Sequence, residues 1–324
     1  MARLHGHSVV KILLTGANGY IGSELLTTLE ASGHEVWCLT RSSPPLRSVH
    51  AYRHIVHDLC QPIPLDNDDF DLVVNAAGAN DVQSSDPSTA LSQSALTARQ
   101  CAEFAARQEA RRLVYISTFQ VYGINEGYVD ESTPCRPTND YGLTHLFAEQ
   151  WIEQFSRTDG LQYIILRPAN IAGLPRAGDM RRWTLTPGCF CLDALRDRRI
   201  VVRSTGLQQR DFLPLREVAR RSVSVCNDFE LFSNRAVNIN SGCTLSIAEV
   251  ARLASERYQA IFGMPCAVEF APILSNERIW SPNPLSISSL YLATHPKEQI
   301  TREQSIDLMI ECIDATYQHL TRPT

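Results

Sequence analysis

The 324-residue chain has no apolar stretch approaching about 20 residues, so we expect no membrane-spanning helix. The polar segment before the first apolar run has no hydrophobic centre, and we therefore expect no signal peptide. Long basic runs are also missing, and the formal net charge is only −5. A nucleic-acid partner is therefore not expected.

Cysteine and histidine do not occur in metal-binding patterns. The ten cysteines include no C-x-x-C pair, and none of them combines with the nine histidines at zinc-site spacing. His50, His54 and His57 are interpreted as a loose surface group. We expect reduced thiols in a cytoplasmic protein and no metal site.

A glycine-rich turn near the N-terminus is the main feature that the sequence does contain. An apolar run over residues 9–14 predicts a buried strand, and apolar residues at helical spacing continue to Gly33. Between a strand and a helix, closely spaced glycines favour a tight turn whose free N–H groups bind the pyrophosphate of a dinucleotide. The candidate cofactor-binding residues of this turn are Gly16, Asn18, Gly19, Tyr20, Ile21 and Gly22.

The end of the second predicted strand, over residues 34–39, bears on the choice of dinucleotide. An acidic residue there would bind the 2′-hydroxyl of NAD, whereas a nearby arginine accommodates the 2′-phosphate of NADP. This chain has Thr40 and Arg41. We therefore expect NADP, with NAD as the alternative. Arg41 could instead be a solvated loop residue or stack on adenine.

Alternating strands and helices predict a doubly wound parallel α/β sheet of the Rossmann type over residues 1–174. A return segment at about 208–242 is expected to rejoin this domain. Residues 175–207 and 243–324 are expected to form a smaller α/β lobe that binds substrate. The expected elements are strands at 70–75, 113–116, 161–166, 200–203, 236–239 and 265–273, helices at 89–109, 218–226, 246–260 and 304–320, and an irregular segment at 175–190.

Several motifs in one order make the chain resemble the extended short-chain dehydrogenase/reductase family. This family contains nucleotide-sugar epimerases, dehydratases and reductases. The resemblance covers nearly the whole chain. Its marks are TGANGYIG at 15–22, Asp58-Leu59, STFQVYG at 117–123, YGLTH at 141–145, RPANIAG at 167–173, RDFLPLREVA at 210–219 and VNINSGCTLSIAEVA at 237–251.

The resemblance implies that Tyr141 exchanges a proton with the substrate while hydride moves to or from nicotinamide. Thr118 would hydrogen-bond the same substrate oxygen. His145 stands where the family usually has lysine, whose charge favours the tyrosinate form and which binds the nicotinamide ribose. With an ordinary pKa near 6.5, His145 would be mostly neutral unless a carboxylate raised that pKa. Ser94 is a second departure from the family pattern, because the family often has asparagine at this position.

Further binding residues follow from the same resemblance and from small residues at the end of a strand. A flat cofactor can lie against Ala76, Ala77 and Gly78. The other expected cofactor contacts are Asp58, Leu59, Tyr141, His145 and Pro168, and the expected substrate contacts are Thr118, Gln120, Asn170, Arg210 and Arg278. The family also implies a homodimer built from the helices at about 90–109 and 141–157.

The residues after Thr118 limit the reaction. Dehydratases of the family usually carry an acidic pair there, and this chain has Phe119 and Gln120, which makes dehydration unexpected. We expect reduction of a keto-sugar nucleotide, with epimerisation through transient oxidation as the alternative. The changes at His145 and Ser94 leave open a dinucleotide-binding or sensing protein without turnover.

Overall fold

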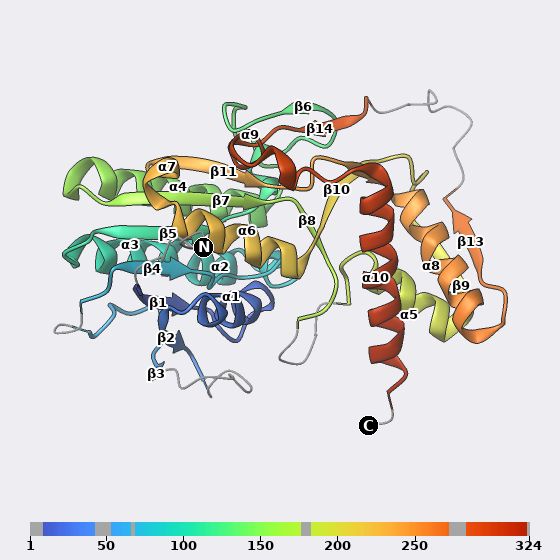
Figure 1. The fold of residues 1–324 in the computed structure, drawn as a ribbon, viewed down its shortest axis with the longest axis horizontal. Helices are drawn as coiled ribbons and strands as arrows, with labels where there is room; N and C mark the ends of the chain where they lie inside the picture. Colours follow the sequence, from blue (N-terminus) through green and yellow to red (C-terminus); the bar gives the residue numbers. More distant parts are fainter. Residues whose placement is uncertain (1–8, 43–52, 66–68, 176–182, 272–282, 323–324) are drawn as a thin grey trace, which may run out of the picture.

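A computed structural model describes residues 9–42, 53–65, 69–175, 183–271 and 283–322 (Figure 1). Its centre is a seven-stranded sheet in which every neighbouring pair is parallel. This arrangement confirms the predicted fold class. In spatial order the strands are β11 (Arg235–Ile239), β7 (Gln162–Pro168), β5 (Arg112–Ile116), β4 (Leu72–Asn75), β1 (Lys11–Thr15), β2 (Glu35–Thr40) and β3 (Arg53–Val56).

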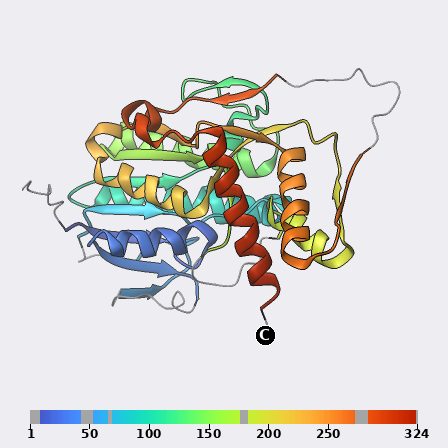
Figure 2. The ribbon, with the colours of Figure 1, turned by 45° about the vertical axis from the view of Figure 1, so that its right-hand side comes forward.

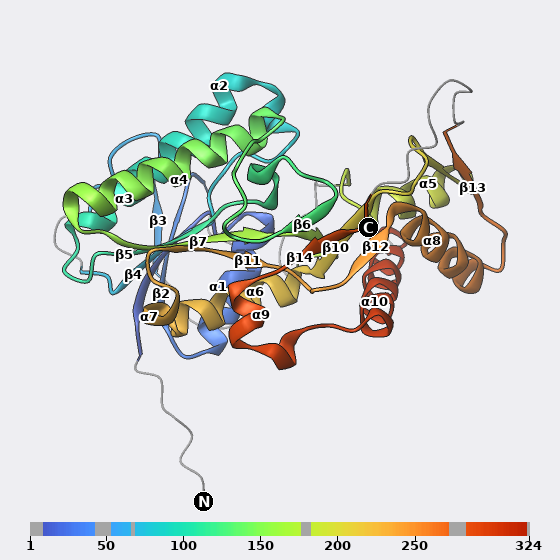
Figure 3. The ribbon, with the colours of Figure 1, turned by 90° about the horizontal axis from the view of Figure 1, so that it is seen from above.

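Helices cover both faces of this sheet, which explains why its inner strands are mostly buried apolar runs, whereas the edge strand β3 is not. Helices α1 (Tyr20–Ala31) and α6 (Leu215–Asn227) pack on one face, and α3 (Thr97–Arg107) and α4 (Asp140–Asp159) pack on the other (Figure 3). The chain runs outward from β1 to β3 and then crosses back to β4 beside β1. The loops after β1 and β4 therefore diverge at the carboxyl edge of the sheet, where doubly wound folds bind ligands.

A separate apolar cluster, away from the central sheet, lies among later elements and includes Phe190, Leu245, Tyr258 and Ile313. Helix α10 (Arg302–Leu320) lies beside α8 (Ile247–Phe262) in this part of the molecule (Figure 2). The strands outside the central sheet form three small sheets. One contains β8 (Asn170–Ala172), β10 (Gln209–Pro214) and β12 (Thr244–Ser246). The other two pair β9 (Arg199–Val202) with β13 (Ala267–Phe270), and β6 (Gly127–Val129) with β14 (Leu285–Ile287). The remaining helices are α2 (Pro87–Ala90), α5 (Gly188–Asp197), α7 (Phe229–Phe232) and α9 (Leu290–Thr294).

Most predicted elements are present, with boundaries that shift by a few residues. Helix α8 begins with the capping box of Ser246 and Glu249 that its sequence predicts. The helix expected over 89–109 is divided into α2, a π-helical turn at Leu91–Leu96 and α3. The segment expected to be irregular contains the first turn of α5. None of the described helices is long and apolar enough to cross a membrane.

Candidate active site

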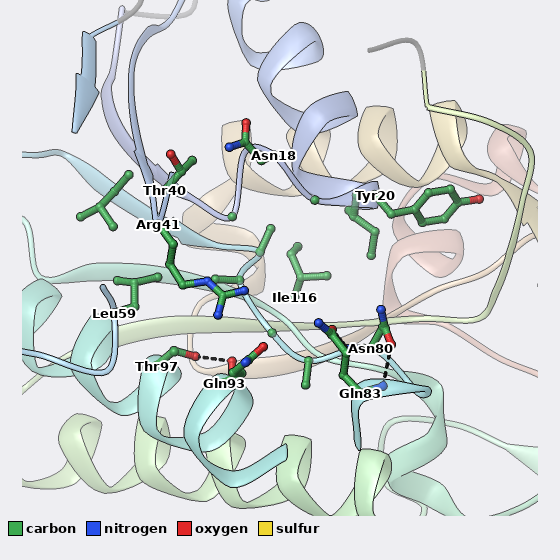
Figure 4. Close-up of a pocket in the computed structure, with 18 of the residues that line it drawn as sticks. Asn18, Tyr20, Thr40, Arg41, Leu59, Asn80, Gln83, Gln93, Thr97 and Ile116 are labelled. Atoms are coloured by element: carbon green, nitrogen blue, oxygen red, sulfur yellow. Dashed lines mark hydrogen bonds between the residues drawn. The ribbon is translucent and has the colours of Figure 1, made fainter. Parts of the chain in front are cut away.

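A cavity of about 330 Å³ lies at the carboxyl edge of the sheet, at the crossover between β1 and β4 (Figure 4). It brings together most of the residues predicted to bind a dinucleotide. Gly22 and Pro168 are exceptions, because Gly22 lies buried in the first turn of α1 against the backbone of Gly16, and Pro168 lines a neighbouring cavity. The predicted residues that line the first cavity are Gly16, Asn18, Gly19, Tyr20, Ile21, Arg41, Asp58, Leu59, Ala76, Ala77, Gly78, Tyr141 and His145.

The glycine turn is too closely packed for side chains at two of its positions. Gly16 has a φ of +74°, and a Cβ atom there would lie 2.6 Å from the carbonyl carbon of Ala76. A Cβ atom at Gly22 would lie 2.0 Å from the carbonyl oxygen of Gly16. Gly19 caps α1 without any side-chain acceptor. The cavity therefore begins at a tight turn and an uncapped helix N-terminus, which fits a pyrophosphate.

The far end of this cavity lies at the end of β2, where an adenosine ribose is expected. The Thr40 hydroxyl is buried and lies 2.6 Å from Nε2 of His54. The Arg41 guanidinium points into the cavity (Figure 4). The backbone N–H of Cys60 donates to the Asp58 carboxylate and lowers the pKa of Asp58, with a smaller contribution from Arg41.

A second cavity, of about 350 Å³, adjoins the first. It is lined by the predicted substrate residues Thr118, Gln120, Asn170 and Arg210, together with Pro168; Arg278 lies outside the described residues. Tyr20, Ile21, Ser117 and Tyr141 line both cavities. Tyr141 therefore stands where a dinucleotide and a second ligand would meet, and Thr118 lines the second cavity beside it.

The polar groups of the second cavity come from a 3-10 turn, the N-cap of α4 and the strands β8 and β10. Thr118 is the N-cap of a 3-10 turn, and its Oγ1 accepts from the backbone N–H of Gln120 at 3.3 Å. Nδ2 of Asn139 donates to Oε1 of Gln120 at 2.8 Å. Burial lowers the pKa of Arg210, whose guanidinium donates to the carbonyl of Gln209. These groups offer hydroxyl, amide and guanidinium contacts to a polar ligand.

His145 lies one helical turn from Tyr141, as its spacing predicts, with ring centroids 4.7 Å apart. His145 is 4% exposed, and burial lowers its pKa to about 4. The sequence left open that a carboxylate raises the pKa of His145. The lowered pKa contradicts this possibility. Nδ1 lies 2.6 Å from Oη of Tyr115 on β5, and Nε2 has no hydrogen-bond partner among the described residues.

Other buried polar residues around the site were missed in the sequence. Glu149 accepts from Ser117 at 2.5 Å and from Arg167 at 2.6 and 3.1 Å. Its position, four residues after His145 on α4, could have indicated the same helix face. Tyr115 gave no such signal, because it lies in an apolar strand. Ser94, identified as a departure, accepts from the backbone N–H of Ala79 at 3.0 Å.

One further contact involves Tyr20, which lines both cavities. Oη of Tyr20, from the first turn of α1, donates to the carbonyl oxygen of Gly173 at 2.6 Å. Gly173 follows β8 directly. The glycine turn is thereby attached to the chain that follows β8, next to the apolar cluster that contains Ala172 and Phe190.

A family model described as "NAD dependent epimerase/dehydratase family" matches residues 12–240. The chain belongs to this family. The match confirms the resemblance found in the sequence. A protein of Methanocaldococcus jannaschii named putative UDP-glucose 4-epimerase is 26% identical over 267 residues, which cover 78% of this chain and 86% of that protein.

A second relative, the UDP-glucose 4-epimerase of Corynebacterium glutamicum, is also 26% identical, over 81% of this chain and 84% of its own length. Among solved structures, UDP-glucuronic acid 4-epimerase from Bacillus cereus in complex with UDP-glucuronic acid and NAD superimposes with a TM-score of 0.74. The match covers 95% of this chain and 99% of that one at 21% identity, and shows a shared fold. The family is NAD-dependent, and these findings do not support NADP as the primary cofactor.

Proposed function

We propose that the protein is an NAD-dependent epimerase that inverts one carbon of a nucleotide sugar. The observation that carries this proposal is that Tyr141 lines both cavities, while Thr118 lines the second cavity together with it. Membership of the family and the two relatives named UDP-glucose 4-epimerase support it. Because the comparisons favour epimerisation, it takes precedence over the reduction expected from the sequence.

The residues of the first cavity fit a dinucleotide, since the glycine turn leaves room for phosphates and Nε2 of His145 lacks a protein partner among the described residues. The glycine turn would hold the pyrophosphate, and His145 would contact the nicotinamide half. When bound, the dinucleotide supplies the acceptor and donor for hydride.

Tyr141 would take the proton of a sugar hydroxyl as that carbon is oxidised, and would return it when the keto-sugar is reduced from its other face. Thr118 would hydrogen-bond the same oxygen and orient it. No carboxylic acid follows Thr118, because Phe119 and Gln120 occupy those positions. The site therefore lacks the acidic pair of the family's dehydratases at this place.

In the second cavity, Arg210 and Asn170 would bind the diphosphate of the substrate, since a guanidinium suits phosphate oxygens. The paired amides of Gln120 and Asn139 would face the sugar.

The first assay is NMR detection of UDP-galactose formed from UDP-glucose with catalytic NAD. Interconversion without net NADH formation supports epimerisation.

Replacing Tyr141 tests the chemical step. Tyr141→Phe should lower kcat by roughly 10²- to 10⁴-fold while nucleotide-sugar binding persists. Tyr128→Phe is the matched control, because Tyr128 is 64% exposed on β6. Equal activity of the two variants would remove Tyr141 from the chemistry.

Reduction of a keto-sugar nucleotide by NADPH is the second candidate, favoured by Thr40 and Arg41 at the end of β2. Arg41→Ala should weaken NADPH binding far more than NADH binding, whereas Arg53→Ala, on neighbouring β3, should change neither. Equal losses would mean that Arg41 does not contact the 2′-phosphate. Net NADPH oxidation marks a reductase, and binding without turnover on any sugar nucleotide marks a sensing protein.

We also propose that two copies pair through the helices on the α3–α4 face. Leu91, Leu143 and Phe147 are large apolar residues there, with exposures of 47%, 36% and 38%. Light scattering should give twice the chain mass, and Phe147→Glu should give a monomer. A monomeric wild-type protein would contradict the pairing.

A further inference from the structure

The strand residue Tyr115 and the helix residue His145 form a buried polar pair beneath the first cavity. The Tyr115 side chain is 0% exposed, and its Oη lies 2.6 Å from Nδ1 of His145. The two rings also stack, with centroids 5.8 Å apart at an interplanar angle of 29°. Among the described residues, Tyr115 Oη has no other hydrogen-bond partner.

The pair can place its protons in only two ways while both groups are neutral. If Tyr115 donates to Nδ1, the imidazole proton sits on Nε2. If Nδ1–H donates to Oη instead, the Tyr115 proton has no acceptor among the described residues. Burial raises the pKa of Tyr115, so the phenol keeps that proton. Within the described part of the chain, the first arrangement leaves one buried group without a protein partner, Nε2–H, whereas the second leaves two, the Tyr115 O–H and the Nε2 lone pair. Because each unpaired buried polar group is costly, the first arrangement is favoured.

No charged group competes for this imidazole. Glu149, one turn further along α4, is bound by Arg167 and Ser117. Cys101 and Tyr141 are the other titratable groups around the pair, and burial raises the pKa of Cys101 to about 12. His145 therefore has one fixed neighbour, at Nδ1, and remains uncharged.

The other ring nitrogen lies beside the cavity wall. Nε2 of His145 is buried, has no partner among the described residues, and would lie 3.9 Å from a Cβ atom at Gly78. Both residues line the first cavity near Tyr141. Arg41 and Asp58, which follow β2 and β3, belong to the adenosine end expected for this fold. A donor at Nε2 therefore serves the half of the dinucleotide nearer Tyr141.

We propose that Tyr115 is a positioning residue that holds neutral His145 in the Nε2–H tautomer, so that Nε2–H donates to a ribose hydroxyl of the nicotinamide half. This inference rests on the proposed dinucleotide site. It assigns His145 the binding contact of the usual lysine without its charge. The contact that a lysine ammonium makes in the family would here be made by His145, held in place by Tyr115 on strand β5 of the central sheet.

Nitrogen-15 NMR of histidine-labelled protein tests the tautomer without any ligand. The His145 signals, assigned by their loss in His145→Asn, should show Nε2–H at neutral pH. Tyr115→Phe should give a mixture of both tautomers. Nδ1–H in the wild-type protein, or an unchanged tautomer in Tyr115→Phe, would overturn the inference whether or not a dinucleotide binds.

Calorimetric titration with NADH tests the binding role. Tyr115→Phe should raise the Kd about 5- to 30-fold. The control is Tyr317→Phe, which also removes the hydroxyl of a fully buried tyrosine that donates to the carbonyl of Ala254, and should leave the Kd unchanged. Comparable losses in both variants, or none in Tyr115→Phe, would contradict positioning.

A lysine at position 145 separates the inference from general damage. In the His145→Lys background the Tyr115→Phe substitution should no longer weaken NADH binding, because an ammonium needs no fixed tautomer. The same loss in both backgrounds would mean that the Tyr115 hydroxyl acts elsewhere. Failure of the wild-type protein to bind NADH would refute the proposed function, while the NMR result still decides the tautomer.

Discussion

Two successive turns of helix α4 bury a polar side chain on the same face, and the two side chains differ in how many hydrogen-bond partners they have. Glu149 is 1% exposed, and its carboxylate accepts two hydrogen bonds from Arg167 and a third from Ser117. His145 is 4% exposed, has one neighbour at Nδ1, and is neutral. Burial of a charge requires a complete set of partners, and only the deeper turn provides one.

The difference matters for the site, because Tyr141 lies one turn on the other side of His145. The face of α4 thus carries the Tyr141 phenol, the neutral His145 imidazole and the Glu149 carboxylate paired with Arg167. The ion pair of Arg167 and Glu149, with N···O at 2.6 Å, anchors the helix to β7. Positive charge is used to hold the helix in place and is not supplied to Tyr141 by His145.

The largest effect is expected from removing the buried ion pair of Glu149 and Arg167. Glu149→Gln leaves the Arg167 guanidinium buried without its counter-charge and should lower the free energy of unfolding by about 3–5 kcal/mol, measured by urea denaturation. Glu153→Gln is the control on the next turn, where the pair with Arg157 is exposed, and should cost less than about 0.5 kcal/mol. Similar losses in both variants would remove the contrast between buried and exposed pairs.

The neutral turn should be visible in the pH dependence of stability. The pKa of His145 is lowered to about 4 by burial, whereas an unfolded histidine has a pKa of about 6.5. Between these values the unfolded chain binds the extra proton, so the His145 contribution is complete above about pH 6.5 and is lost as the pH falls toward 4. The loss should reach about 3 kcal/mol.

Urea denaturation of the wild-type protein and of His145→Asn over this pH range measures that contribution as the difference between the two curves. The carboxylates titrate in both proteins and cancel. A difference that does not change with pH would mean that His145 takes up a proton in the folded protein as readily as in the unfolded chain.

Restoring a charge at the neutral turn gives a smaller effect, on activity. His145→Lys should keep the fold and place an ammonium near Tyr141, which favours the phenolate. The pH at which activity reaches half its maximum should fall by about one unit. An unchanged pH–rate profile would show that position 145 does not act on Tyr141.

The contrast between these turns could be predicted only in part from the sequence. Periodic apolar residues and the order of motifs identified the sheet, the glycine turn and the Tyr141–His145 spacing. The partners of those residues depend on which strand passes beneath α4. Tyr115 belongs to an apolar run, and its hydroxyl meets His145 only because β5 and α4 pack together.

Similar reasons explain the other differences. The division of the 89–109 helix depends on a local change of hydrogen-bond register, which a helical spacing of apolar residues does not reveal. The low pKa of His145 follows from complete burial, which one sequence does not report. The predicted cofactor residues came together because the carboxyl ends of parallel strands share one edge.

The smallest effect should come from the periphery of the charged turn. Ser117→Ala removes one donor to Glu149 and leaves both Arg167 contacts, so thermal unfolding should report a loss of about 1–2 kcal/mol. A loss as large as that of Glu149→Gln would mean that the hydroxyl, and not the guanidinium, secures the carboxylate.

The hydroxyl of Tyr20 carries a final consequence, because it attaches the glycine turn to Gly173 and its side chain lines both cavities. A ligand that immobilises the turn also restrains one wall of the neighbouring compartment. Occupancy of either compartment should therefore tighten the other by the same factor, as thermodynamic reciprocity requires. Each ligand would then affect binding of the other through the Tyr20 side chain, before any proton or hydride moves between them.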